Sequence, residues 1–104
     1  MTEKPTIESL KGQPVVYMLR CRDDSLYTGW TNDFVQRLAT HRAGKGGKYT
    51  RSRLPLEPVY LELLPDRSAA LQREAAIKKM APAAKRALIS SQDNVLPSVI
   101  SLLP

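Results

Sequence analysis

Apolar positions recur along the chain with two different periods, which separate the predicted strands from the predicted helices. A period of two runs through residues 15–30 and is interrupted at residues 22–24, which is the pattern of a β-hairpin. A third apolar run, at residues 59–64, indicates another strand. Helical spacing predicts three helices, at residues 34–43, at residues 69–80 with Ser68 as the N-cap, and at residues 83–90.

The register of the hairpin decides which side chains share a face of the sheet. A three-residue loop, with Asp24 in the left-handed conformation, pairs Tyr17 with Gly29 and places Tyr17 diagonally from Tyr27 on one face. A two-residue loop would place the two tyrosines on opposite faces. We predict the three-residue loop, because two phenols that converge over a glycine leave room for a ligand. The alternative is that both tyrosines only fill a half-buried sheet.

The length of 104 residues and the apolar content of 42% predict a single domain. We expect residues 14–90 to form it, with residues 1–13 as an N-terminal arm and residues 91–104 as an apolar tail that either packs back or meets a partner protein. The one cysteine, Cys21, is expected to be a buried apolar residue, which favours a reducing compartment. Since the chain starts with no secretory leader and has no run of about 18 apolar residues, we expect a soluble cytoplasmic protein that contacts no membrane.

Positive charge is concentrated in one segment. The chain has 16 Lys and Arg against 10 Asp and Glu, a net charge of +6, and residues 34–56 alone hold a surplus of the same size with no acidic residue. Glycines and a tyrosine lie between the basic residues of the predicted loop at residues 44–58, and they permit backbone approach to phosphates and contact with a base. We therefore expect a nucleic acid as the partner; a solvated basic face is the alternative. The candidate nucleic-acid-binding residues are Lys45, Lys48, Tyr49, Arg51 and Arg53.

Arg37 and His41 are four residues apart on the first predicted helix, so they project from the same side of it. Either residue alone would more commonly face solvent or pair locally. Together, directly after the two-tyrosine hairpin, a guanidinium and an imidazole can hold a phosphate and serve an in-line displacement.

Glu74 lies on the second predicted helix, and three of its four neighbours one turn away are apolar. A carboxylate that points toward a core must be paired, protonated or bound to a cation. One interpretation is an ion pair with Lys78, at the favourable spacing for a Glu–Lys pair. The other is a metal site, since Mg²⁺ is often held by only one or two carboxylates together with phosphate and water.

In their order along the chain, these residues resemble the GIY-YIG nuclease superfamily. The resemblance is carried by Val15-Val16-Tyr17, by Tyr27-Thr28-Gly29, by Arg37 and His41 on one helix, and by Glu74 on a later helix. It extends over residues 14–89 and is closest to small stand-alone bacterial GIY-YIG proteins, which are similar at residues 48–51, 66–71 and 77–79. Val15 and Val16 replace the Gly-Ile of the first name motif and Thr28 replaces the Ile of the second, whereas both tyrosines and Gly29 remain.

The resemblance implies an α+β fold, in which about three helices flank a three-stranded antiparallel sheet with a DNA-cleaving site on an exposed face. It implies that Tyr17 or a metal-bound water activates the nucleophile, that Tyr27 lines the phosphate site, and that Arg37 neutralises charge on the phosphate. By the same resemblance Glu74 would hold a single Mg²⁺ or Mn²⁺ ion and His41 would assist proton transfer. Tyr49 is a weaker match to the family site.

The expected function is a divalent-metal-dependent endonuclease that hydrolyses DNA phosphodiester bonds in branched, nicked or single-stranded substrates during DNA repair or processing. A first alternative is a nucleic-acid-binding module that has no turnover or needs a partner, because the chain lacks the added DNA-recognition domain that many family nucleases carry. A second alternative is a scaffold that meets another protein through its tail. The joint presence of Tyr17, Tyr27, Arg37 and Glu74 favours the nuclease, since a pure binder needs no such glutamate.

Overall fold

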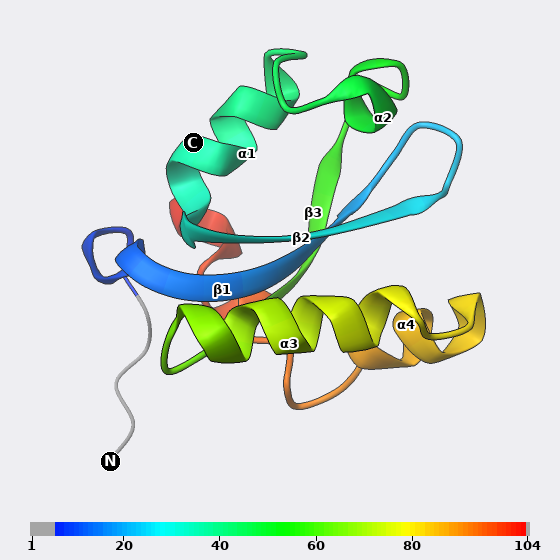
Figure 1. The fold of residues 1–104 in the computed structure, drawn as a ribbon. Helices are drawn as coiled ribbons and strands as arrows, with labels where there is room; N and C mark the ends of the chain where they lie inside the picture. The colour runs from blue at the N-terminus through cyan, green and yellow to red at the C-terminus, as the bar shows by residue number, and fades with distance from the viewer. Residues whose placement is uncertain (1–5, 104) are drawn as a thin grey trace.

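The computed structural model describes residues 6–103, which form a three-stranded antiparallel sheet with helices on both faces (Figure 1). The strands are β1 (Lys11–Arg20), β2 (Leu26–Asp33) and β3 (Glu57–Leu63), in the order β2-β1-β3. The α-helices are α1 (Phe34–Arg42), α2 (Lys48–Arg51), α3 (Arg67–Lys78) and α4 (Pro82–Ile89), and 3₁₀ turns lie at Glu8–Leu10, Leu96–Ser98 and Ile100–Leu102. The predicted α+β class is therefore confirmed, with a short additional helix, α2, inside the predicted loop. Within residues 6–103, no helix combines the length and the hydropathy that crossing a bilayer requires.

The hairpin of β1 and β2 has the predicted register. Tyr17 is paired with Gly29 and Leu19 with Tyr27, and the Cys21 N–H donates to the Ser25 carbonyl across 2.9 Å. The loop has three residues because Asp24 takes the left-handed conformation, with φ of 66°. Tyr17 and Tyr27 consequently lie on the same face of the sheet.

Strand β1 lies at the centre of the sheet, and its side chains contribute to a core on each face. One core is covered by α1 and by the C-terminal turns, and the other by α3 and α4 (Figure 1). Val15, Tyr17 and Leu19 belong to the first core, whereas Val16 and Met18 belong to the second. This alternation is the period of two seen in the sequence.

The C-terminal segment packs back on the domain. The Asn94 side chain accepts from the Leu61 N–H across 3.1 Å and donates to the carbonyls of Val59 and Ile89, each across 2.9 Å. Asn94 thereby holds the end of α4 against β3. Among the apolar tail residues, Leu96 and Val99 are buried in the first core, whereas Ile100 and Leu102 stay exposed.

The N-terminal part of the expected arm also belongs to the fold. Leu10 is buried in the first core and β1 begins at Lys11, so the described residues 6–13 are not a separate arm. Residues 1–5 lie outside the described part of the chain. The expected boundary at residue 14 is thus later than the point where packing begins.

Aspartates cap the two helices that carry the candidate site residues. The Asp33 carboxylate accepts from the Gln36 N–H at the start of α1. At α3, the predicted N-cap Ser68 is wrong, because Asp66 takes that position and accepts from the Ala69 N–H across 2.8 Å. The helix therefore begins two residues earlier than expected, at Arg67.

We expect the substitution Thr28→Val to raise the free energy of unfolding by about 1 kcal/mol. Among the described residues, the Thr28 hydroxyl is the one buried side-chain polar atom without a hydrogen-bond partner, and valine removes that oxygen without changing the shape of the side chain. Urea unfolding measures the change. The matched control is Thr31→Val, which deletes an acceptor of the Asp33 N–H at 3.1 Å and should destabilise the protein. A loss of stability in the Thr28→Val variant would show that the unpartnered hydroxyl of Thr28 does not cost stability.

Candidate active site

Two strands and one helix bring three aromatic side chains together on the face of the sheet that α1 covers. Tyr17 comes from β1, Tyr27 from β2 and His41 from α1. The ring centroids are 6.4 Å apart for Tyr17 and Tyr27, 5.8 Å for Tyr17 and His41, and 5.2 Å for Tyr27 and His41. The predicted convergence of the two phenols is therefore present, and the imidazole completes a cluster of three rings.

Gly29 determines where the Tyr17 hydroxyl lies. A Cβ atom at Gly29 would stand 2.6 Å from the Tyr17 hydroxyl oxygen, so any other residue would displace the phenol. The expectation that this glycine leaves room for a ligand is wrong, because the Tyr17 phenol itself fills the space. Tyr17 is only 1% exposed, and its part of the sheet face is covered rather than open.

The His41 imidazole is buried and both of its nitrogens are engaged. Nε2 lies 2.9 Å from the Tyr17 hydroxyl, and Nδ1 lies 3.0 Å from the Thr50 hydroxyl. Gly46 packs on the ring so closely that a Cβ atom there would overlap it. Burial, and then the charge of Arg37, lower the pKa of His41 to about 4. The ring is therefore neutral at pH 7, with one nitrogen protonated and the other free to accept.

The Arg37 guanidinium interacts electrostatically with both tyrosines. It is half-buried, and its Nη2 donates to the Gly46 carbonyl across 3.4 Å, a long hydrogen bond. Burial raises the pKa of Tyr17 to about 12, and the nearby Arg37 opposes this rise without cancelling it. Tyr17 thus keeps its proton at neutral pH.

Glu74 lies on α3, which packs on the opposite face of the sheet from Tyr17 and His41. Its side chain is 18% exposed and pairs with Lys78 Nζ across 3.5 Å, while its negative charge contributes to the raised pKa of Tyr17. The predicted Glu–Lys pair is therefore formed, and the carboxylate is also within electrostatic range of the tyrosine. Within residues 6–103 no group of three or more His, Cys, Asp and Glu side chains could enclose a metal ion. Glu74 fits a Mg²⁺ ion only as a single ligand, with phosphate and water supplying the rest.

The basic loop divides into exposed cations and residues held within the fold. Lys45, Lys48 and Arg51 are exposed. Tyr49 is 39% exposed and lies between its neighbours, with its ring centroid 6.0 Å from that of Tyr27 and 3.8 Å from the Arg53 guanidinium carbon. Of the five candidate nucleic-acid-binding residues, Lys45, Lys48 and Arg51 are therefore the exposed cations that a ligand can reach.

The Arg53 guanidinium donates hydrogen bonds to other residues of the protein. Its Nε donates to the Asp23 carboxylate across 3.0 Å, and its Nη1 donates to the Tyr49 carbonyl and to the Ser52 hydroxyl, each across 3.1 Å. These contacts join the hairpin loop to α2. A role of Arg53 in DNA binding stays a prediction, because its guanidinium is already engaged by Asp23, Tyr49 and Ser52.

Comparison with known proteins identifies the family of this chain. The family model described as the GIY-YIG catalytic domain matches residues 13–86, and these residues contain the tyrosines, Arg37, His41 and Glu74. The chain belongs to the GIY-YIG family. That family is one of nucleases, so the coarse class predicted from the sequence is confirmed.

Small proteins of the same kind are similar over most of their length. A UPF0213 protein of Oceanobacillus iheyensis is 48% identical over 81 residues, which are 78% of this chain and 94% of the relative. A UPF0213 protein of Natronomonas pharaonis is 47% identical over 77 residues, 74% of this chain and 91% of the relative. The solution NMR structure of a UPF0213 protein of Bacillus halodurans superimposes with a TM-score of 0.54 at 34% identity, covering 86% of this chain and 96% of that chain.

Sequence reasoning did not single out Thr50 and Gly46, both of which contact His41. Thr50 is an ordinary polar residue inside a basic loop, and nothing in its neighbours predicts that it is buried against an imidazole. Gly46 was noted for backbone approach to phosphates, whereas its contact is with His41. Both assignments depend on how the loop folds over α1, which no local pattern specifies.

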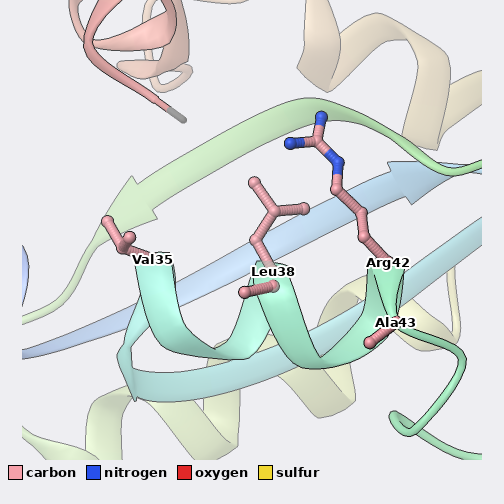
Figure 2. A pocket seen from close by; sticks show the side chains of 5 residues that line it. Val35, Leu38, Arg42 and Ala43 are labelled. Atoms are coloured by element: carbon pink, nitrogen blue, oxygen red, sulfur yellow. The ribbon is translucent and has the colours of Figure 1, made fainter.

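The pocket in Figure 2 lies along α1 and shares no lining residue with the cluster of Tyr17, Tyr27 and His41. Its volume is about 390 Å³, and Val35, Leu38 and Arg42 project into view from the same side of the helix. Its full lining is Val35, Leu38, Ala39, Arg42 and Ala43. Neither the tyrosines nor Glu74 take part in it.

We expect acid to destabilise this protein through His41. The folded pKa of about 4 lies below the ordinary value of 6.5, so the unfolded chain takes up a proton first as the pH falls. The stabilisation is present above pH 6.5 and is lost as the pH falls through 4, by up to about 3 kcal/mol. Urea unfolding at several pH values measures it.

The matched control is His41→Gln, which cannot titrate in this range. The difference in unfolding free energy between wild type and His41→Gln should shrink from pH 7 to pH 4. A difference that stays constant with pH would show that His41 has an ordinary pKa and is not buried as described.

Proposed function

We propose that this protein is a divalent-metal-dependent endonuclease that hydrolyses DNA phosphodiester bonds. The observation that carries the proposal is the 2.9 Å contact between the Tyr17 hydroxyl and a neutral His41, with Arg37 in electrostatic range of both tyrosines. A hydroxyl next to a neutral imidazole is the arrangement of a proton relay. An adjacent guanidinium suits the negative charge that a phosphodiester develops during displacement. The cytoplasmic location and a role in DNA repair or processing stay predictions.

As water attacks the phosphorus and the bond to the leaving oxygen breaks, Tyr17 would pass its proton to His41 and take the proton that the water loses. The leaving oxygen would take a proton from solvent. Burial raises the pKa of Tyr17 to about 12 and lowers the pKa of His41 to about 4, so transfer of the Tyr17 proton to His41 is unfavourable in the free protein. A Tyr17 phenolate therefore needs additional positive charge nearby at neutral pH. A divalent cation at Glu74 would supply such charge, activating water and neutralising the phosphate.

Arg37 would bind the scissile phosphate and, in doing so, weaken its interaction with Tyr17. Its hydrogen bond to the Gly46 carbonyl is long, at 3.4 Å, whereas a phosphate offers two shorter charge-assisted bonds. Because the guanidinium interacts electrostatically with both tyrosines, its movement toward a phosphate would weaken that interaction. Tyr27, which is half-buried, then lines the phosphate site.

Two observations favour a second candidate, a nucleic-acid-binding module without turnover. Tyr17 is 1% exposed, and Glu74 is the one carboxylate that we place at the site, where it pairs with Lys78. Both features would suit a site that binds phosphate and performs no chemistry. A cleavage assay distinguishes the two functions directly.

We expect Glu74→Gln to abolish Mg²⁺-dependent cleavage of DNA while the dissociation constant for DNA changes less than threefold. The substitution removes the charge that would bind the cation and leaves a side chain of equal size. Labelled single-stranded, duplex, nicked and branched DNAs provide the assay, with fluorescence anisotropy for binding. The matched control is Glu57→Gln, which neutralises a carboxylate paired with Arg20 and should leave the rate unchanged. Cleavage by Glu74→Gln at the wild-type rate would contradict the metal assignment.

We expect replacement of Lys45, Lys48 and Arg51 by alanine to weaken binding to all DNA sequences alike. Each lost phosphate contact should flatten the dependence of log K on log salt by about 0.9 for duplex DNA. A variant with Lys79, Lys85 and Arg86 replaced by alanine is the control, because it loses the same three charges elsewhere. If both variants flatten the salt dependence equally, the loop is not the binding surface.

A further inference from the structure

The orientation of the His41 ring depends on a residue that has no place in the proposed reaction. Thr50 is 1% exposed, and its hydroxyl lies 3.0 Å from His41 Nδ1. It comes from α2, which begins at Lys48 and ends at Arg51. A helix of one turn does not hold itself together, so other contacts must fix Thr50 where it is.

Arg53 supplies those contacts. Its Nη1 donates to the Tyr49 carbonyl in α2 across 3.1 Å, its Nε donates to Asp23 across 3.0 Å, and its guanidinium carbon lies 3.8 Å from the Tyr49 ring centroid. The Arg53 carbonyl also accepts from the Arg22 N–H across 2.9 Å. A half-exposed ion pair alone contributes little, but here it acts together with three further contacts at one side chain and its backbone. The hairpin loop and α2, which carries Thr50, are thereby joined.

The chemistry of the groups around Tyr17 determines which His41 nitrogen carries the proton. The positive charge of Arg37 interacts with the Tyr17 hydroxyl, so it favours the orientation in which the oxygen faces the guanidinium and the proton points away from it. The Tyr17 proton remains to be donated, and the acceptor within reach is His41 Nε2. A neutral imidazole with an accepting Nε2 is protonated at Nδ1, and that N–H donates to Thr50.

We propose that Thr50 is a positioning residue that fixes His41 in the Nδ1–H form, with the Nε2 lone pair directed at Tyr17, and that Arg53 holds α2 so that it can do so. The proposal rests on the proposed nuclease function for its consequence, and on the contacts above for its geometry. It replaces DNA contact as the role of Arg53. It also gives Gly46 a role, because any larger residue there would push the ring away from both hydroxyls.

The imidazole can be observed directly, because His41 is the only histidine of the chain. Two-bond ¹⁵N–¹H NMR spectra of the untagged protein distinguish the Nδ1–H form from the Nε2–H form at neutral pH. Wild type and Thr50→Ser should both show the Nδ1–H form, since serine keeps the hydroxyl. Thr50→Val should show a mixture or the other form, since the Nδ1–H would lose its acceptor. A wild-type Nε2–H form, or an unchanged spectrum in the valine variant, overturns the proposal.

Kinetics test the consequence. Thr50→Val should lower the single-turnover cleavage rate by about 10-fold to 100-fold, with an unchanged dissociation constant for DNA, and Thr50→Ser should restore it. If the NMR result is as expected and wild type cleaves no DNA, the positioning stands and the nuclease proposal fails. If the valine variant cleaves as fast as wild type, the role of Thr50 in the reaction is overturned.

Arg53→Ala distinguishes a brace from a DNA contact. A brace predicts a changed His41 tautomer ratio and a slower reaction with unchanged DNA affinity. Weaker DNA binding with a flatter salt dependence and an unchanged His41 spectrum would make Arg53 part of the DNA-binding surface and overturn its role as a brace. Lys11→Ala, which removes an exposed cation at the start of β1, is the control for the loss of one charge.

Discussion

Burial of a neutral imidazole between two hydroxyls is the interaction on which the site of this protein depends. His41 bonds to Tyr17 through one nitrogen and to Thr50 through the other, so a helix, the central strand and a one-turn helix are fixed relative to each other at one ring. Since burial and Arg37 both disfavour the charged ring, it acts as a fixed proton acceptor rather than a cation. Protonation of this ring would place an unpaired charge in the core beside a guanidinium.

The hairpin register decides that this interaction can form at all. Side chains along a strand alternate between faces, so a slip of one residue would turn Tyr17 toward α3 and away from His41. The left-handed Asp24 sets the register, and Gly29 then gives the Tyr17 hydroxyl the space that a side chain would take. The backbone conformation of Asp24 and the missing side chain of Gly29 thus determine where Tyr17 lies.

The sequence predicted the parts of this arrangement that depend on local pattern. The hairpin and its loop, the first helix with Arg37 and His41 on one side, and the Glu74–Lys78 pair follow from periodicity, turn chemistry and helix spacing. Helix α3 begins earlier than expected because Asp66, rather than Ser68, is its N-cap.

The remaining features depend on contacts between residues far apart in the chain. The tail packs inward because one amide side chain, that of Asn94, satisfies three backbone groups of other elements, which composition does not reveal. Arg53 belongs to a basic run in the sequence, yet its partner Asp23 lies 30 residues away in the hairpin loop. The buried position of Thr50 has the same origin, because the loop must fold over α1 before the two residues meet.

The most direct test of the proposed nuclease is the single-turnover rate of DNA cleavage by wild type and by Tyr17→Phe in Mg²⁺. Phenylalanine keeps the buried ring and removes only the hydroxyl that contacts His41. We expect unchanged DNA affinity and a rate lower by at least about 100-fold, the usual contribution of a proton-transferring group. Equal rates for the two proteins, or a wild type that binds these DNAs and cleaves none, would contradict the central claim.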